Sequence, residues 1–217
     1  MDKHYYEKIF STQRMAKYFT RYPDNEQKAI DHYHANIELS ECFYPTVSML
    51  EVALRNSLNR ELTDHFGTED WYLRIESTPG LRNLKNEINT AKRHIINRSE
   101  SITASKVVAE LTLGFWVRLL NAEYERILWK PLRKAFPYLE KNKRQRNKVS
   151  GPINKIRNFR NRIFHHEPIC WNLNEIENVH QDIIHVMGWL NKDLPNIASK
   201  SDRSTIVINN IREKLID

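Results

Sequence analysis

The feature of this sequence that most constrains its fold is one long segment in which apolar residues recur every three or four positions. The recurring residues are Leu39, Phe43, Val47, Leu50, Leu54, Leu58, Leu62 and Phe66. This spacing places them on one face of a helix, and Gly67 directly after them suits a helix C-terminus. We therefore predict a central core helix that ends at Gly67.

The rest of the chain favours an all-α fold. Five glycines in 217 residues are few for a sheet protein with many tight turns. Further helices are expected at about 11–21, from a capping box at Asp24 and Gln27 to about 36, and at about 81–97, 104–121, 124–136, 152–166, 172–190 and 204–215. Two other segments, about 69–81 and 137–150, have the composition of loops.

One domain over residues 1–217 is the simplest organisation, with a polar helical insertion at about 69–101 and a C-terminal helical tail at about 203–217. No run of roughly 18 apolar residues is present, so no membrane span is expected. The N-terminus lacks the apolar core of a signal peptide, which predicts a cytoplasmic protein.

Cys42 and Cys170 are far apart and form no C-x-x-C pair. This pattern suggests neither a zinc site nor a disulfide framework. Both cysteines are expected to be small buried hydrophobic residues. His180 and His185 are five apart rather than four, so they too are expected to be structural or surface groups. No metal and no other cofactor is predicted.

Positive charge is concentrated in one part of the chain. The formal net charge is +7. Between residues 133 and 162 the single acid is Glu140, and the cations are Arg133, Lys134, Lys141, Lys143, Arg144, Arg146, Lys148, Lys155, Arg157, Arg160 and Arg162. Such a run is usually a solvated face, but Lys and Arg clusters also bind phosphate backbones. We predict that Lys141, Lys143, Arg144, Arg146, Lys148, Lys155 and Arg157 contact RNA.

The basic run leads into a second apolar stripe. Ile153, Ile156, Phe159 and Ile163 recur at helical spacing, which predicts a helix from about Pro152.

A stretch at the end of this helix contains polar residues of types that can take part in catalysis. It contains Arg160, Asn161, His165 and His166, and it stops at Pro168. Because proline disfavours helical backbone at the preceding residue, the histidines are expected in the last turn or just past it. Arg160 and His165 point roughly 140° apart on one ideal helix. Either the helix loosens before the proline, or a site gathers these groups from more than one copy of the helix.

The order Arg160-Asn161-x-x-x-His165 resembles the R-N-x-x-x-H signature of the HEPN superfamily of RNA-cutting domains. The doubled histidine followed by Glu-Pro is similar to the bacterial abortive-infection (Abi-like) branch. The resemblance implies a HEPN-like helical bundle. It also implies that Arg160 clamps a phosphate, that His165 is a general acid or base, and that Asn161 orients either of them. His166 is a second candidate for the histidine role.

The resemblance covers about residues 13–194 and includes Glu51-x-x-x-Arg55-Asn56 and the string from Thr112 to Arg118. By spacing alone, Glu51 and Arg55 share a helix face and could form an ordinary ion pair worth a few tenths of a kcal/mol. The resemblance implies that they belong to the site, where they would orient the motif.

These expectations define a function. The resemblance implies a metal-independent endoribonuclease toxin of an abortive-infection or toxin-antitoxin system, which defends a bacterium against phage. HEPN domains commonly pair two motif helices in a homodimer, so a homodimer is implied. RNA would be the substrate, and an RNA or protein antitoxin would restrain the enzyme. Some HEPN toxins carry a tyrosine two residues after the histidine that an antitoxin modifies, but here that residue is Glu167. The alternative is a non-catalytic module that binds a structured non-coding RNA.

Overall fold

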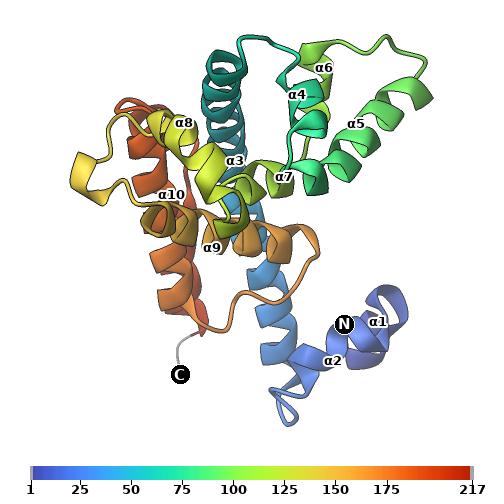
Figure 1. Cartoon of the computed structure of the whole chain (residues 1–217). Coiled ribbons are helices and arrows are strands. Elements are labelled where there is room, and N and C mark those ends of the chain that lie inside the picture. Colours follow the sequence, from blue (N-terminus) through green and yellow to red (C-terminus); the bar gives the residue numbers. More distant parts are fainter. Residues whose placement is uncertain (1, 216–217) are drawn as a thin grey trace. The chain divides into compact units, whose positions relative to one another are not determined.

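The computed structural model describes residues 2–215, and in that range it contains helices and no strand (Figure 1). The predicted all-α fold class is therefore confirmed. Residues 216 and 217, at the end of the predicted C-terminal tail, lie outside the described residues, as does residue 1. None of the helices within residues 2–215 has both the length and the apolar character needed to cross a bilayer.

The described chain divides into two compact units. One contains residues 2–47, 158–181 and 198–215, and the other contains residues 48–157 and 182–197. The α-helices are α1 (Lys3–Phe10), α2 (Thr12–Phe19), α3 (Glu26–Phe66), α4 (Trp71–Ser77), α5 (Lys85–Asn97), α6 (Ala104–Glu110), α7 (Leu113–Arg118), α8 (Lys130–Leu132), α9 (Arg146–Phe164), α10 (Leu173–Leu190), α11 (Leu194–Ser199) and α12 (Ser204–Leu215). Short helical turns at Arg82–Leu84, Ala122–Tyr124, Glu125–Trp129, Arg133–Ala135 and Lys141–Lys143 complete the helical elements of the described chain.

Helix α3 confirms the predicted central helix and is longer than expected. It has 41 residues and includes the segment that was predicted as a separate helix. The predicted capping box is wrong, because the side chain of Asn25, rather than that of Asp24, accepts a hydrogen bond from the N–H of Lys28 at 2.9 Å. Pro45 lies inside the helix and removes one backbone hydrogen bond. Phe43 and Val47 are buried on either side of it, so packing holds the helix continuous.

Two segments expected to be loops contain helix. Helix α4 occupies residues 71–77, because Trp71, Tyr72 and Ile75 are buried on one face and Trp71 Nε1 donates to Asn59 Oδ1 at 2.8 Å. Helix α9 begins at Arg146 and not near Pro152. The basic loop predicted at 137–150 is therefore helical in its last part.

Burial explains the early start of α9. Val149 and Ser150 are buried, and Arg146 Nη1 donates to Ser150 Oγ at 2.9 Å across the first turn of the helix. Pro152 lacks an N–H, but it costs the helix only one hydrogen bond near its start.

The second unit has an aromatic core in the segment that was expected to be a helix at about 104–121. Phe115 and Trp116 of α7 are buried, and their ring centroids lie 6.2 and 5.8 Å from that of Trp71. The continuous helix expected at 104–121 is instead two helices, because the Thr112 side chain accepts from the N–H of Phe115 and caps α7. Helix α5, which lies in the predicted polar insertion, buries Ile88 and Ile95 on one face.

The first unit places α2 against the chain that follows α9. Tyr18 of α2 packs with its ring centroid 5.4 Å from that of Tyr33 in α3 and 5.2 Å from that of Trp171. Phe43 of α3 packs edge-on against Phe159 of α9 with centroids 4.8 Å apart. These contacts bring together three segments that are distant in sequence and that supply the residues of the site.

Structural roles predicted for the cysteines and for His180 are confirmed. Cys42 and Cys170 are buried, and burial raises the pKa of each thiol to about 12. His180 is buried, and its Nε2 lies 2.6 Å from Asp202 Oδ2. His185 is exposed.

Candidate functional site

The buried stripe of α9 fixes which residues of the motif face outward. Phe159 and Ile163 are buried, as predicted. Arg160 and Asn161 are partly exposed, and His165 is exposed. The polar groups of the motif thus lie along the accessible side and the end of the helix.

Helix α9 ends in a pair of nested hydrogen bonds just beyond its last residue. The N–H of His166 donates to the carbonyl of Ile163 at 2.9 Å, and the N–H of Glu167 donates to that of Arg162 at 2.8 Å. This is the Schellman arrangement, in which the turning residue adopts left-handed backbone. His166 has φ of 54° there, a conformation that costs a side-chain-bearing residue about 1–2 kcal/mol. As predicted, His165 and His166 lie just past the helix.

The segment after the histidines is held from two sides. Asn36 of α3 is 4% exposed, and its amide donates to the carbonyl of Glu167 at 3.3 Å and accepts from the N–H of Ile169 at 2.6 Å. On the other side, Arg162 Nη2 donates to the carbonyl of Pro168 at 2.8 Å. The backbone that carries the two histidines is therefore fixed by side chains of α3 and α9.

The histidines line a small polar pocket with two cations of α2. The pocket has a volume of about 300 Å³, and its lining residues are Ser11, Gln13, Arg14, Lys17, His165, His166, Glu167 and Pro168. Arg14 Nη1 donates to the backbone carbonyl of His166, which ties α2 to the turn. Two imidazoles, a guanidinium and an ammonium in one pocket are groups that suit a phosphate and the transfer of protons to and from it.

Arg160, the predicted phosphate clamp, is not among the residues that line this pocket. Its guanidinium carbon lies 4.1 Å from the centroid of the Phe164 ring, four positions along the helix. Such a cation–π contact holds the guanidinium over the ring. The sequence predicted that Arg160 and His165 diverge on a single helix, and the pocket that His165 lines is not lined by Arg160.

Arg14 and Lys17 were not predicted as site residues. They lie three positions apart in a helix that was correctly expected, and that spacing places them near each other on its surface. Nothing in the local pattern connects them with a motif about 150 residues away. Tertiary contacts, among them the packing of Tyr18 against Trp171 and the hydrogen bond from Arg14 to His166, bring α2 to the end of α9.

The predicted RNA-binding residues all belong to the second unit, and several of them make close intramolecular contacts. Lys143 pairs with Glu140 at 2.7 Å, Arg144 donates to the carbonyls of Leu139 and Pro137 at 2.6 and 2.5 Å, Arg146 pairs with Glu125 at 2.9 Å, and Lys155 pairs with Asp182 at 2.7 Å. Lys141 and Lys148 are exposed, and Arg157 is partly exposed. Lys143 and Lys155 are exposed as well, so four lysines of the set are accessible to solvent.

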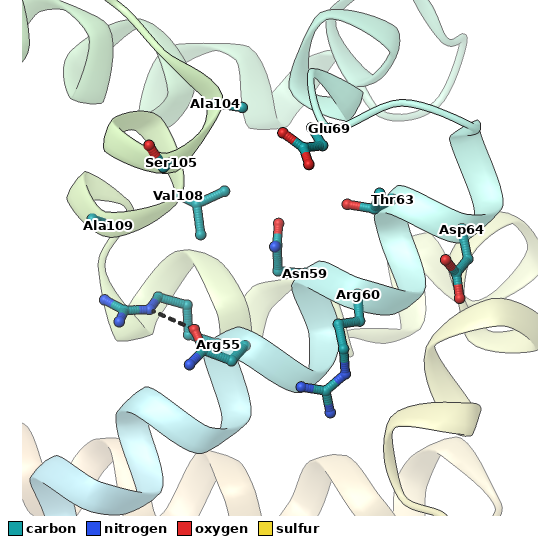
Figure 2. Close-up of a pocket in the computed structure, with 11 residues that line it drawn as sticks. Arg55, Asn59, Arg60, Thr63, Asp64, Glu69, Ala104, Ser105, Val108 and Ala109 are labelled. Carbon is teal, nitrogen blue, oxygen red and sulfur yellow. Dashed lines mark hydrogen bonds between the residues drawn. The ribbon is translucent and has the colours of Figure 1, made fainter.

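Glu51 and Arg55 also belong to the second unit, on α3. Arg55 lines a polar pocket of about 500 Å³ between α3 and α6, together with Asn56, Asn59, Arg60, Thr63, Asp64, Glu69, Ala104, Ser105, Val108 and Ala109 (Figure 2). Its Nε donates to Asn56 Oδ1 at 3.4 Å, the dashed line in Figure 2. Since the motif histidines lie in the first unit, the predicted role of Glu51 and Arg55 in orienting them stays a prediction.

Among the described residues, no three His, Cys, Asp or Glu side chains are grouped so that they could hold a metal ion. Comparisons of the chain with models of known protein families, with curated proteins and with solved structures found no match.

Proposed function

We propose that this protein is a metal-independent endoribonuclease of the HEPN type. The observation that supports this most directly is the pocket at the end of α9, in which His165 and His166 lie with Arg14 and Lys17. The motif Arg160-Asn161-x-x-x-His165 and its resemblance to the Abi-like branch supply the reaction class. The pocket supplies groups that this reaction needs.

The reaction is an attack by the 2′-hydroxyl of RNA on the adjacent phosphodiester. One histidine takes the proton of the 2′-hydroxyl as the new P–O bond forms, and a protonated histidine gives a proton to the 5′-oxygen as the old P–O bond breaks. Imidazole suits both steps because its ordinary pKa lies near neutrality. The products are a 2′,3′-cyclic phosphate and a 5′-hydroxyl. DNA lacks the nucleophile and is not cut.

Charge that develops on the phosphoryl group needs fixed cations. Arg14 and Lys17 are the cations that share the pocket with the histidines, so we assign them to the scissile phosphate. Arg160 of the same chain points to Phe164. In a homodimer that pairs two α9 helices, Arg160 of one protomer would serve the pocket of its partner. Asn161 would orient either group.

The proposed biological role is phage defence by abortive infection in the bacterial cytoplasm. An enzyme that cuts cellular RNA must be restrained until infection, so we propose an antitoxin as partner. The exposed cations Lys141 and Lys148 would suit an inhibitory RNA as well as a substrate.

The second candidate function is a non-catalytic module that holds a structured non-coding RNA. The basic segment from Lys141 to Arg157 favours it, because that segment could bind RNA without any contribution from the histidines. This candidate predicts that His165→Ala leaves RNA affinity and biological effect unchanged.

The test is incubation of purified protein with mixed cellular RNA in EDTA, followed by analysis of the fragment ends. Wild type is compared with His165→Ala, Arg160→Ala and His185→Ala, the last being a control at another exposed histidine. Cleavage by wild type and His185→Ala that leaves cyclic phosphates, with loss in the other two variants, supports the proposal. Intact RNA in all four reactions, with equal binding, contradicts it and favours the binding module.

A further inference from the structure

A second hollow of the first unit adjoins the histidine pocket. It has a volume of about 810 Å³, and Arg14 and His166 line both spaces. The side chains that give it its apolar character are Phe10, Tyr33, Ile37, Tyr44, Ile163 and Phe164. A groove rich in aromatic rings therefore begins where the cationic pocket ends.

Its rings are accessible and come from three helices. Tyr44 of α3, Phe164 of α9 and Phe10 of α1 are 59%, 44% and 41% exposed. The Tyr44 and Phe164 centroids are 6.2 Å apart, and those of Phe10 and Tyr33 are 5.1 Å apart, with both pairs tilted. Aromatic rings exposed in this way are suited to stacking with a planar ligand.

Glu41 is the acidic residue that lines the groove. Because it is paired with Arg203, it repels an anionic ligand less than an unpaired carboxylate would. The carboxylate of Glu41 is 2.7 Å from the guanidinium of Arg203. Arg14 is among the lining residues, so the groove is both aromatic and cationic at the end that it shares with the histidine pocket. The ligand class that combines a planar π-face with an attached phosphate is a nucleotide.

We infer that this groove holds the unpaired base next to the scissile phosphate, so that the substrate is single-stranded RNA. The inference rests on the proposed nuclease function and adds to it. A phosphate between Arg14, Lys17 and the histidines places its own nucleotide at the shared boundary of the two spaces. Bases of a duplex are stacked and paired and cannot enter, whereas unpaired bases can be turned out onto aromatic side chains.

Binding can be tested without cleavage. The probe is a short single-stranded oligonucleotide with 2′-O-methyl sugars, which cannot react, and one fluorescent 2-aminopurine base. Wild type should quench the fluorescence by stacking. Tyr44→Ala and Phe164→Ala should each weaken binding about ten-fold and reduce the quenching. Tyr44→Phe keeps a ring and should bind as wild type does. Tyr5→Ala, which removes an exposed ring outside the groove, serves as the matched control.

Folding of each variant is checked by its thermal unfolding profile. Equal quenching by wild type, Tyr44→Ala and Phe164→Ala, or no binding by wild type, overturns the inference. It is also overturned if Tyr44→Ala and Phe164→Ala bind normally but convert a dimer to a monomer in sedimentation, because the groove would then be an interface between copies.

Failure of the nuclease proposal would give different results from failure of the groove inference. If wild type binds the probe through Tyr44 and Phe164 but leaves unmodified RNA intact, the groove binds a base and the enzyme assignment is wrong. If wild type cuts single-stranded and duplex RNA equally well and the ring variants cut normally, the enzyme assignment holds and the groove inference is wrong.

Discussion

Asn36 and Ile169, separated by 133 positions, are joined by a hydrogen bond of 2.6 Å in which the side-chain oxygen of Asn36 accepts from the backbone N–H of Ile169. The same oxygen accepts from the N–H of Cys170 at 3.3 Å, and the Asn36 amide nitrogen donates to the carbonyl of Glu167. One buried side chain on α3 therefore satisfies three backbone groups of the segment that follows the histidines.

Asn36→Ala should lower the free energy of unfolding by about 2–3 kcal/mol, because it leaves buried backbone groups without partners. It should also reduce RNA cleavage, since the turn at His166 loses its support. Urea unfolding and a cleavage assay measure the two effects. Thr46→Val is a control on the same helix, because it removes a buried hydroxyl that bonds to the carbonyl of Phe43 within α3. A change below about 0.5 kcal/mol in Asn36→Ala would contradict this role.

Lys17→Met should reduce the rate of RNA cleavage about ten-fold or more with little effect on stability. The substitution keeps the apolar stem and removes the charge that we assign to the phosphate, and charge-assisted hydrogen bonds are worth about 1.5–3 kcal/mol. Lys8→Met in α1 removes a comparable exposed charge outside the pocket. Equal rates for the two variants in a steady-state assay would remove Lys17 from the site.

His166→Gly should be as stable as wild type or more stable in urea unfolding. The free energy of unfolding should rise by up to about 1–2 kcal/mol, because glycine adopts the left-handed backbone at φ of 54° without a side-chain penalty. His166→Ala keeps that penalty and should not be stabilised. Comparison of His166→Gly with His166→Ala separates the effect of the backbone conformation on stability from the effect of the lost imidazole on cleavage. If cleavage survives in His166→Gly, then His165 is the essential histidine, and a loss in both variants assigns a proton-transfer role to the His166 side chain.

Asp202 should make the stability of the first unit depend on acid pH. Burial acts to raise the pKa of its carboxyl, but hydrogen bonds from the backbone and side chain of Ser204 and from His180 outweigh it and lower the pKa below its ordinary value of 3.8. A lowered folded-state pKa means that this stabilisation is present above about pH 4 and is lost as the pH falls below that value. Asp202→Asn should be less stable at pH 7 and should show a smaller loss between pH 5 and about pH 3. Parallel loss in wild type and variant would contradict the assignment.

Lys148→Ala and Arg144→Ala should separate two roles within the basic segment. Lys148 is exposed, so its loss should weaken RNA binding and reduce the salt dependence of affinity by about one charge. Arg144 donates to two backbone carbonyls, so its loss should mainly lower stability. Binding titrations at several salt concentrations, with urea unfolding, distinguish them. If Arg144→Ala changes only the salt dependence, the structural role is wrong.

Much of the fold was predictable because burial imposes a period on the sequence. The stripes of α3 and α9 and the aromatic core around Trp116 follow from apolar spacing alone. Helix boundaries were less predictable, because α9 was expected to begin near Pro152 and begins at Arg146. Pro45 and Pro152 both lie inside helices, because buried neighbours outweigh the single hydrogen bond that each removes.

The site was predictable only in part. The residue types near Pro168, and the exposure of His165 and His166 past the helix, followed from the chain. The cations of α2 could not be assigned, since tertiary packing and not local pattern brings Arg14 to His166. The left-handed backbone at His166 was also missed, because the residue that usually occupies this position after a helix is glycine.

The contact between Arg14 and His166 spans 152 positions of the chain. A growing polypeptide therefore carries the cations of the pocket about 150 residues before it has His165 and His166 to place beside them. For a protein proposed to cut RNA, this order means that a nascent chain still being translated cannot yet attack the message and the ribosome that are producing it.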